Sequence, residues 1–145
     1  MDWKREAADK LRTYEAKRTS IKISEERIER LKSDITRIRS ASEDGTQVSG
    51  GTNVRDDVVV NNIAEREEMR IAKELAKRSV EMIETALKEL DDTERLLLDR
   101  FYIHRAKGNV ERLCEELAVE KTTVYRWKDQ ALRHFTLALY GVVET

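Results

Sequence analysis

The sequence predicts an all-α protein in which a long antiparallel helical hairpin, of the coiled-coil type, precedes a compact group of shorter helices. Three observations predict this class. Charged and hydrophobic residues each make up 39% of the 145 residues and aromatics only 6%, a composition typical of amphipathic helices. The chain has no proline that would interrupt a helix. Apolar residues recur at spacings of three and four, so that each helix can bury one face.

Residues 2–42 are expected to form the first long helix. One heptad position carries Ala7, Tyr14, Ile21, Ile28 and Ile35, and the other carries Leu31 and Ile38. Such a seam is what a coiled coil presents to its partner. Lys10, Lys17 and Ser24 interrupt the second position, so the first half of this helix is expected to be loosely held.

A glycine-rich break follows at residues 43–55, which read EDGTQVSGGTNVR. Three glycines with Ser, Thr and Asn predict a flexible linker or hairpin tip. Residues 57–90 are then expected to form the second long helix, with Asp56 or Asp57 capping its first turn. The β-branched run Val58-Val59-Val60 weakens the helix prediction there and leaves a short strand or an extended entry open.

The two long helices are expected to pair with each other and with a second copy of the chain. Residues 1–42 carry twelve Lys and Arg against eight Asp and Glu, and residues 43–90 carry seven against eleven, so the segments attract. The seam Ile28-Leu31-Ile35-Ile38 is expected to pair with Val80-Ile83-Leu87-Leu90. Two helices alone leave apolar surface in water, so residues 1–90 are predicted to be an oligomerisation hairpin, with a dimer favoured.

Residues 91–145 are predicted to form a separate domain of three helices. Asp91-Asp92-Thr93-Glu94 before an apolar run is a helix-start pattern, and this helix is expected to end near Ile103. A break at 104–109 separates it from a short helix at 110–118. A turn at 119–121 leads into a last helix from about Thr122 to Tyr140.

The stretch from Val110 to Leu132 has the pattern of a helix-turn-helix. Such a motif needs apolar residues where its two helices cross and small residues where their backbones approach. Leu113 and Leu117 supply the first, Cys114 and Ala118 the second, and Val124 and Trp127 are expected to face inward from the second helix. A turn residue with positive φ is usually Gly, so Ala118 would cost a little.

The outward side of the second helix then carries the candidate DNA contacts. Hydroxyl, aromatic and basic side chains near a helix N-terminus can read bases in a major groove and hold phosphates. Residues 119–135 have four cations against two carboxylates, a locally basic segment in a nearly neutral domain. Arg126 is the best candidate for a base contact, and Lys121 and Lys128 are expected to contact phosphates. The full set of predicted DNA-binding residues is Lys121, Thr122, Thr123, Tyr125, Arg126 and Lys128.

Residues 90–135 resemble the C-terminal promoter-reading domain of bacterial sigma factors, region 4. The matching features are Leu-x-x-x-Glu-Arg, the pair Phe101-Tyr102, the LCEELAV helix and turn, then Thr-Val-Tyr-Arg and Ala-Leu-Arg. With a long helical segment and a Gly/Ser-rich break in front, the chain resembles the ArpU/RinA-like late-gene regulators from phages of Gram-positive bacteria. This resemblance implies a sequence-specific transcription regulator, an activator of late phage genes, acting on double-stranded DNA. The chain departs from many relatives at Gly108-Asn109-Val110-Glu111.

Other classes of function lack their signatures. A single cysteine, Cys114, forbids an internal disulfide, fits a reducing compartment and is expected to fill the core. His104 and His134 stand alone, and no phosphate loop or nucleophile motif is found, so no cofactor, metal site, catalytic residue or enzyme activity is expected. No apolar stretch reaches the length of a membrane span, so a cytoplasmic protein with no membrane partner is expected. The resemblance to phage regulators implies that this is the cytoplasm of a bacterial host cell.

Two other functions remain open from the sequence. One is a DNA-recognition subunit of a phage packaging machine, like a small terminase, which also joins a helix-turn-helix to an oligomerising coiled coil. The other is a module that docks on RNA polymerase or a sigma factor through the acidic side chains Glu111, Glu115 and Glu116. The neutral charge of residues 91–145 is unusual for a DNA-binding domain, because such domains are usually basic.

Overall fold

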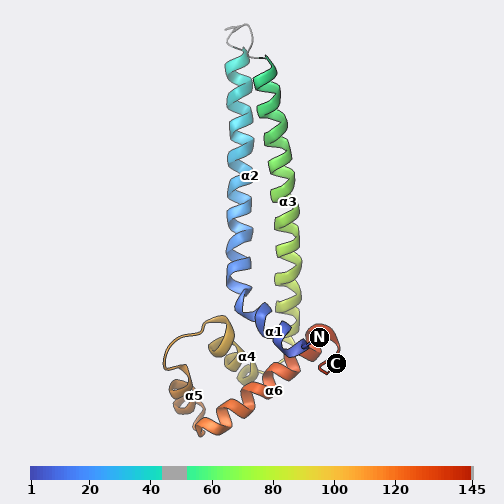
Figure 1. Ribbon diagram of the computed structural model, residues 1–145. Helices are drawn as coiled ribbons and strands as arrows, with labels where there is room; N and C mark the ends of the chain where they lie inside the picture. The colour runs from blue at the N-terminus through green and yellow to red at the C-terminus, as the bar shows by residue number, and fades with distance from the viewer. Residues whose placement is uncertain (44–51, 145) are drawn as a thin grey trace. The chain divides into compact units, whose positions relative to one another are not determined.

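The protein is all-α over the described residues, which are 1–43 and 52–144 of the computed structural model (Figure 1). The side chains are described for residues 1–40 and 56–144. The elements are α1 (Trp3–Arg12), α2 (Tyr14–Glu43), α3 (Thr52–Lys88), α4 (Asp92–Leu98), a π-helical turn η1 (Asp99–Ile103), α5 (Asn109–Leu117) and α6 (Lys121–Tyr140). None of the helices in the described ranges is long and apolar enough to cross a membrane.

The chain divides into two compact units. One comprises Met1–Lys17 together with Ser79–Thr145, and the other comprises Arg18–Arg78. These units differ from the predicted division at residue 90, because the N-terminal helix and the end of α3 belong with the C-terminal helices. They will be called the head unit and the hairpin unit.

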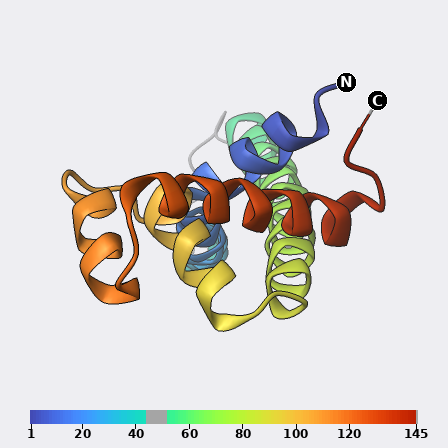
Figure 2. The same ribbon diagram turned by 90° about the horizontal axis from the view of Figure 1, so that it is seen from below.

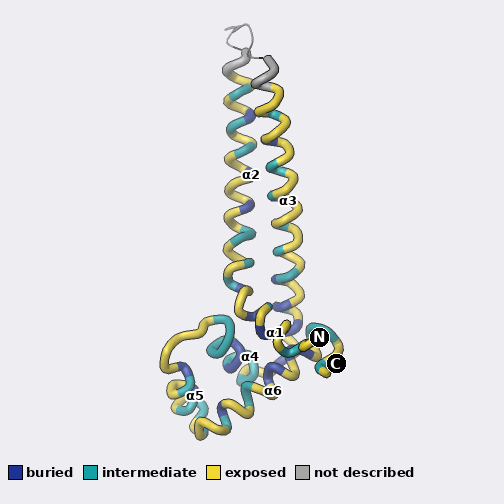
Figure 3. The backbone as a smooth tube through the Cα atoms, viewed as in Figure 1, coloured by how far each residue is buried: buried dark blue, intermediate teal, exposed yellow. Residues whose placement is uncertain are grey.

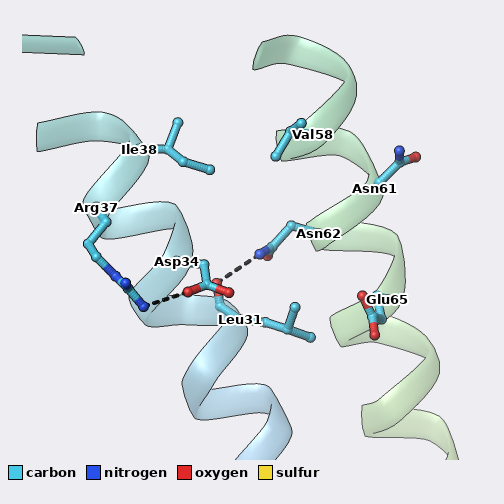
Figure 4. Close-up of a pocket in the computed structure, with 8 residues that line it drawn as sticks. All are labelled: Leu31, Asp34, Arg37, Ile38, Val58, Asn61, Asn62 and Glu65. Atoms are coloured by element: carbon cyan, nitrogen blue, oxygen red, sulfur yellow. Dashed lines mark hydrogen bonds and ion pairs between the residues drawn. The ribbon is translucent and has the colours of Figure 1, made fainter. Parts of the chain in front are cut away.

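In the hairpin unit, α2 and α3 lie side by side and run in opposite directions (Figure 1). Buried and half-buried positions lie on the facing sides of the two helices, with exposed positions elsewhere (Figure 3). Ile28 and Ile35 of the predicted seam are buried, 7% and 6% exposed. The buried amide of Asn62 donates to the carbonyl oxygen of Leu31 at 2.8 Å (Figure 4). A polar group buried in such a seam fixes the register of the two helices.

The predicted pairing of the two seams is wrong. Leu31 lies opposite Asn62, and Glu25 forms an ion pair with Lys73 at 3.6 Å, so the 28–38 seam faces the first half of α3. The 80–90 seam instead lies along the start of the chain, where Tyr14 donates to Glu84 at 2.7 Å. The reason is geometric: in an antiparallel pair, residues at equal distances from the turn meet, and residues 80–90 are too far from it.

The head unit is built around α6, against which α1, α4 and α5 pack (Figure 2). Phe135 of α6 and Leu113 of α5 are fully buried, as are Leu97 and Leu98 of α4 within 1%. Helix α1 contributes Leu11, which is also 0% exposed, and its Trp3 ring lies 5.0 Å from that of Tyr140. Burying each such side chain stabilises the fold by about 1.5–3 kcal/mol.

The predicted single helix over 2–42 is divided at Thr13. The Thr13 hydroxyl donates to the carbonyl oxygens of Asp9 and Lys10, and its backbone (φ −96°, ψ 0°) leaves the α-helical region. A hydroxyl that bonds to the preceding turn competes with the regular helix and bends it. The N-terminal segment therefore forms a short helix, α1, with its own N-cap at Asp2, whose side chain accepts from the Arg5 amide at 3.1 Å.

Of the other predicted helix starts, the one at Asp91 agrees with the structure and the one at Asp56 or Asp57 does not. Helix α3 begins at Thr52, so neither Asp56 nor Asp57 caps it, and Val58-Val59-Val60 is helical rather than a strand. The predicted linker 43–55 falls largely outside the described residues, and its ends belong to α2 and α3. The capping box at Asp91 is confirmed: the Asp91 carboxylate accepts from the Glu94 amide at 2.8 Å, and Glu94 accepts from the Asp91 amide at 3.3 Å.

Candidate nucleic-acid interface

The connection between α5 and α6 is held by buried side chains on both helices and by one residue in the left-handed region. Leu113 and Val124 are both 0% exposed. Ala118 has φ 54° and ψ 46°, and the following amide, of Val119, donates to the carbonyl oxygen of Cys114 at 3.2 Å. Helix α6 then begins at Lys121. These few residues turn the chain sharply between a nine-residue helix and a twenty-residue helix.

The N-terminal half of α6 presents most of the predicted contact residues to solvent. Tyr125 is 41% exposed, and Arg126 is exposed and makes no hydrogen bond or ion pair within the described part of the chain. Thr123 is half-buried beside Val124. The predicted residues that lie on the exposed surface are Lys121, Thr122, Tyr125 and Arg126.

Lys128 lies differently from the free phosphate ligand that the sequence predicts. Its side chain is only 20% exposed and forms an ion pair with Asp129 at 3.1 Å. Its ammonium lies 5.3 Å from the centre of the Phe101 ring and 5.8 Å from that of Tyr125. Cations near aromatic faces are held by the ring quadrupole. Lys128 therefore joins α6 to η1 and supplies charge to the space beside them.

That space is a hollow of about 720 Å³ beside the exposed face of α6, and it will be called the basic hollow. It collects five cations and one carboxylate, although the whole chain has a net charge of −1. Low-dielectric walls lined by one sign of charge raise the local concentration of the opposite sign. The cations are Arg12, Arg100, Arg105, Lys107 and Lys128, the carboxylate is Glu111, and Phe101, Tyr102 and Tyr125 line it with aromatic rings.

The five cations are not equally available to a ligand. Arg100 forms an ion pair with Glu116 at 3.2 Å. Arg12 pairs with Asp9 at 2.7 Å and lies over the Tyr102 ring at 5.3 Å. By contrast, the exposed loop cations, Arg105 and Lys107, make no ion pair or hydrogen bond within the described residues.

A buried asparagine shapes the loop that carries these two cations. The Asn109 side chain is 7% exposed and donates to the carbonyl oxygens of Arg100 at 2.7 Å and His104 at 3.3 Å. Gly108, with φ 81°, supplies the left-handed residue directly before α5. The segment Gly108-Asn109, a departure from the sigma-like pattern, is thus a built corner of the hollow.

Sequence reasoning missed Arg12, Arg105 and Lys107. The two loop cations stood in a segment read only as a helix break, although a Gly-Asn pair after basic residues is a usable signal for a shaped loop. Arg12 had no signal, because α1 is more than ninety residues from α6 in the sequence and only their packing brings it to the hollow.

The three acidic side chains of the polymerase-docking alternative, Glu111, Glu115 and Glu116, lie on α5. Glu115 is exposed, whereas Glu116 is held by Arg100 and Glu111 lines the basic hollow. The structure also places the other residues that the sequence analysis singled out. Cys114 is a free, half-buried thiol rather than a fully buried one. His134 forms a close contact with Glu94, and Trp127 is half-buried beside it. Within 1–43 and 52–144, no group of three His, Cys, Asp or Glu is suited to hold a metal ion.

Residues 37–136 match the family described as protein of unknown function (DUF1492), which covers more than half of the chain. The chain belongs to this family. No curated protein and no solved structure matches it.

Proposed function

We propose that this protein is a sequence-specific DNA-binding transcription regulator, acting in the cytoplasm of a bacterial host on late phage genes. The observation that carries the proposal is Arg126 on the first half of α6, which is exposed, has no partner among the described residues and lies near a hollow lined by five cations. A helix that follows a tight turn and presents Arg, Tyr and Thr near its N-terminus has the chemistry needed in a major groove. The resemblance of residues 90–135 to sigma region 4 supports the same function, and the resemblance of the chain to the ArpU/RinA-like phage regulators supports the late-gene role.

In this proposal the exposed residues of α6 and the basic hollow contact different parts of the DNA. Arg126, with Thr122 and Tyr125, reads base edges, because these side chains are exposed, although the Tyr125 ring also packs 5.7 Å from that of Phe101. The basic hollow holds the sugar-phosphate backbone, because Arg105 and Lys107 line it and have no ion-pair partner in the part of the chain that the structure describes. Contacts to phosphates fix the position of a protein on DNA and contacts to bases supply specificity.

The experiment starts by selecting bound fragments from the cognate phage or bacterial genome with the full-length protein, and then measures affinity by fluorescence anisotropy. Arg126→Ala is expected to cost about 1–3 kcal/mol on the selected site and much less on random DNA. Arg105→Ala/Lys107→Ala is expected to weaken both DNAs alike, and to lower the slope of log K against log salt by about two.

Arg133→Ala is the matched control, since Arg133 is an exposed arginine on the second half of α6 that pairs with Glu144 at 3.2 Å. It is expected to leave both affinities unchanged. Equal losses for Arg126→Ala and Arg133→Ala, or no fragment enriched by the selection, would contradict the proposal.

A second candidate function is docking on RNA polymerase or a sigma factor. The observation that favours it is Glu115, which is exposed on α5 and makes no ion pair within the described residues. Glu115→Lys would then abolish binding to purified polymerase in a pull-down while Arg126→Ala leaves it intact. Retention of polymerase binding by Glu115→Lys, with loss of DNA binding by Arg126→Ala, would reject this alternative.

A further inference from the structure

Helix α3 carries a second apolar face within the hairpin unit, besides the face that packs against α2. Val60, Ile71 and Leu75 are 62%, 55% and 61% exposed, and Ile63 beside them is 51% exposed. On the part of α2 in the same unit, Ile23 is the one large hydrophobic residue exposed to this degree among the described residues. The apolar exposure is thus concentrated on α3.

These residues form a continuous line, here named the outer stripe. The stripe consists of Val60, Ala64, Glu67, Ile71, Leu75 and Arg78. Their spacing of 4-3-4-4-3 contains the eleven-residue repeat that follows the axis of a nearly straight helix. At about 100° per residue, Asn62 and Lys73, which contact α2, lie on the opposite side of α3. The outer stripe therefore faces away from α2, and at about 1.5 Å per residue it extends roughly 27 Å.

Two opposite charges interrupt the stripe at positions eleven residues apart. Glu67 and Arg78 are both exposed. Each has a partner on its own helix, Arg70 for Glu67 at 2.6 Å and Glu74 for Arg78 at 3.8 Å, with all four side chains more than half exposed. Exposed pairs of this kind contribute little and can rearrange. The stripe is thus acidic in its first half and basic in its second.

This asymmetry distinguishes the two ways in which the stripe could pack against another copy of itself. A parallel copy would place Glu67 beside Glu67 and Arg78 beside Arg78. An antiparallel copy, centred between Ala72 and Lys73, places each Glu67 opposite the other chain's Arg78 and each Ile71 near the other chain's Leu75. The antiparallel arrangement therefore pairs the two charges and the central apolar residues, Ile71 and Leu75, and it does so twice.

We propose that two copies of this chain pair antiparallel through the outer stripe of α3. The partner that the surface fits is a second copy, because the stripe is complementary to itself in charge as well as apolar along its length. The pairing rests on α3 alone and does not depend on what α6 binds. It gives a surface to the dimer expected from the sequence, and this surface is different from the seams that were expected to form it.

The test uses sedimentation velocity and equilibrium of the full-length protein with charge-swap variants. Glu67→Arg and Arg78→Glu are each expected to weaken the dimer at least about tenfold, because each turns two attractive contacts into two repulsive ones. The double variant Glu67→Arg/Arg78→Glu restores the attraction and is expected to dimerise within about threefold of the original. Glu26→Arg, an exposed reversal on α2, is the control and should change nothing.

Helicity by circular dichroism, measured on each variant, separates loss of pairing from loss of folding. Ile71→Glu is expected to give a folded monomer, since it places a charge at the centre of the stripe without touching the face toward α2. A parallel dimer would respond differently, because each single reversal would only exchange one like-charged contact for another and leave association unchanged. The inference would be overturned by that result, by a strict monomer at about 100 µM, or by a dimer that Ile71→Glu leaves intact. None of these measurements involves DNA, so failure here is distinct from failure of the proposed regulator function.

Discussion

Replacing Ala118 by Gly is expected to stabilise the head unit, although Ala→Gly substitutions in helical proteins usually destabilise. Ala118 has φ 54° and is the one described non-glycine residue with positive φ. An alanine in the left-handed region costs about 1–2 kcal/mol, because its Cβ crowds the following carbonyl. Glycine removes this strain but gives the unfolded chain more freedom, which costs about 0.4–1 kcal/mol. Because the Ala118 side chain is exposed, no packing is lost, and the net gain is about 0.5–1 kcal/mol.

Tryptophan fluorescence provides a local assay for this substitution, because both tryptophans, Trp3 and Trp127, lie in the head unit. A gain of this size should raise the midpoint of thermal unfolding by roughly 2–6 °C. The matched control is Ala138→Gly, at an exposed position inside α6, which is expected to destabilise by about 0.5–1 kcal/mol. If both substitutions destabilise equally, Ala118 is not strained, and the argument from its backbone angle fails.

Two further predictions concern α6. Phe135→Ala should lower the free energy of unfolding by about 3–5 kcal/mol, because the ring is 0% exposed and its removal leaves a cavity. Leu137→Ala, at a residue 51% exposed on the same helix, should lower it far less. Equal losses for the two variants in urea titrations would refute the packing. Burial, with a smaller contribution from Glu6, raises the pKa of Tyr140 above its ordinary value near 10, so the folded state holds this proton more tightly and the associated stability is lost as pH rises above 10. In absorbance at 295 nm, Tyr140→Phe should remove part of the late-titrating tyrosine signal, and a titration unchanged by that substitution would contradict the shift.

Features encoded within a few residues could be predicted from the sequence. The capping box at Asp91 and Glu94 was readable because the Asp-x-x-Glu pattern needs only one turn of helix. The strain at Ala118 was readable because a sharp turn between two helices demands a left-handed residue whatever surrounds it. The burial of Leu113 and Val124 followed from the positions that must be apolar where the two helices of a helix-turn-helix cross. In each case the physical cause lies close in sequence to its effect.

Features that depend on distant segments could not be predicted, or were predicted wrongly. The 28–38 and 80–90 seams are both apolar and both are largely buried, yet neither packs on the other, because apolar composition does not specify register. Register here is associated with Asn62, a residue that periodicity alone would count as an interruption. The path of α1 was missed for a similar reason. The heptad pattern continues through Thr13, but the hydroxyl of that residue bonds to the preceding turn and Leu11 is buried in the head unit.

The position of α1 changes what a C-terminal fragment would contain. A chain cut at the predicted boundary, residue 90, would lose Leu11, which is 0% exposed, and the contact of Trp3 with Tyr140. It would also lose Arg12, one of the five cations of the basic hollow. Residues 91–145 alone have nine cations against ten carboxylates. The N-terminal segment adds one more cation to the hollow, Arg12, when the full chain folds. Weak binding of DNA by such a fragment would therefore reflect an incomplete core and an incomplete hollow, and the DNA-binding surface has to be tested in the full-length protein.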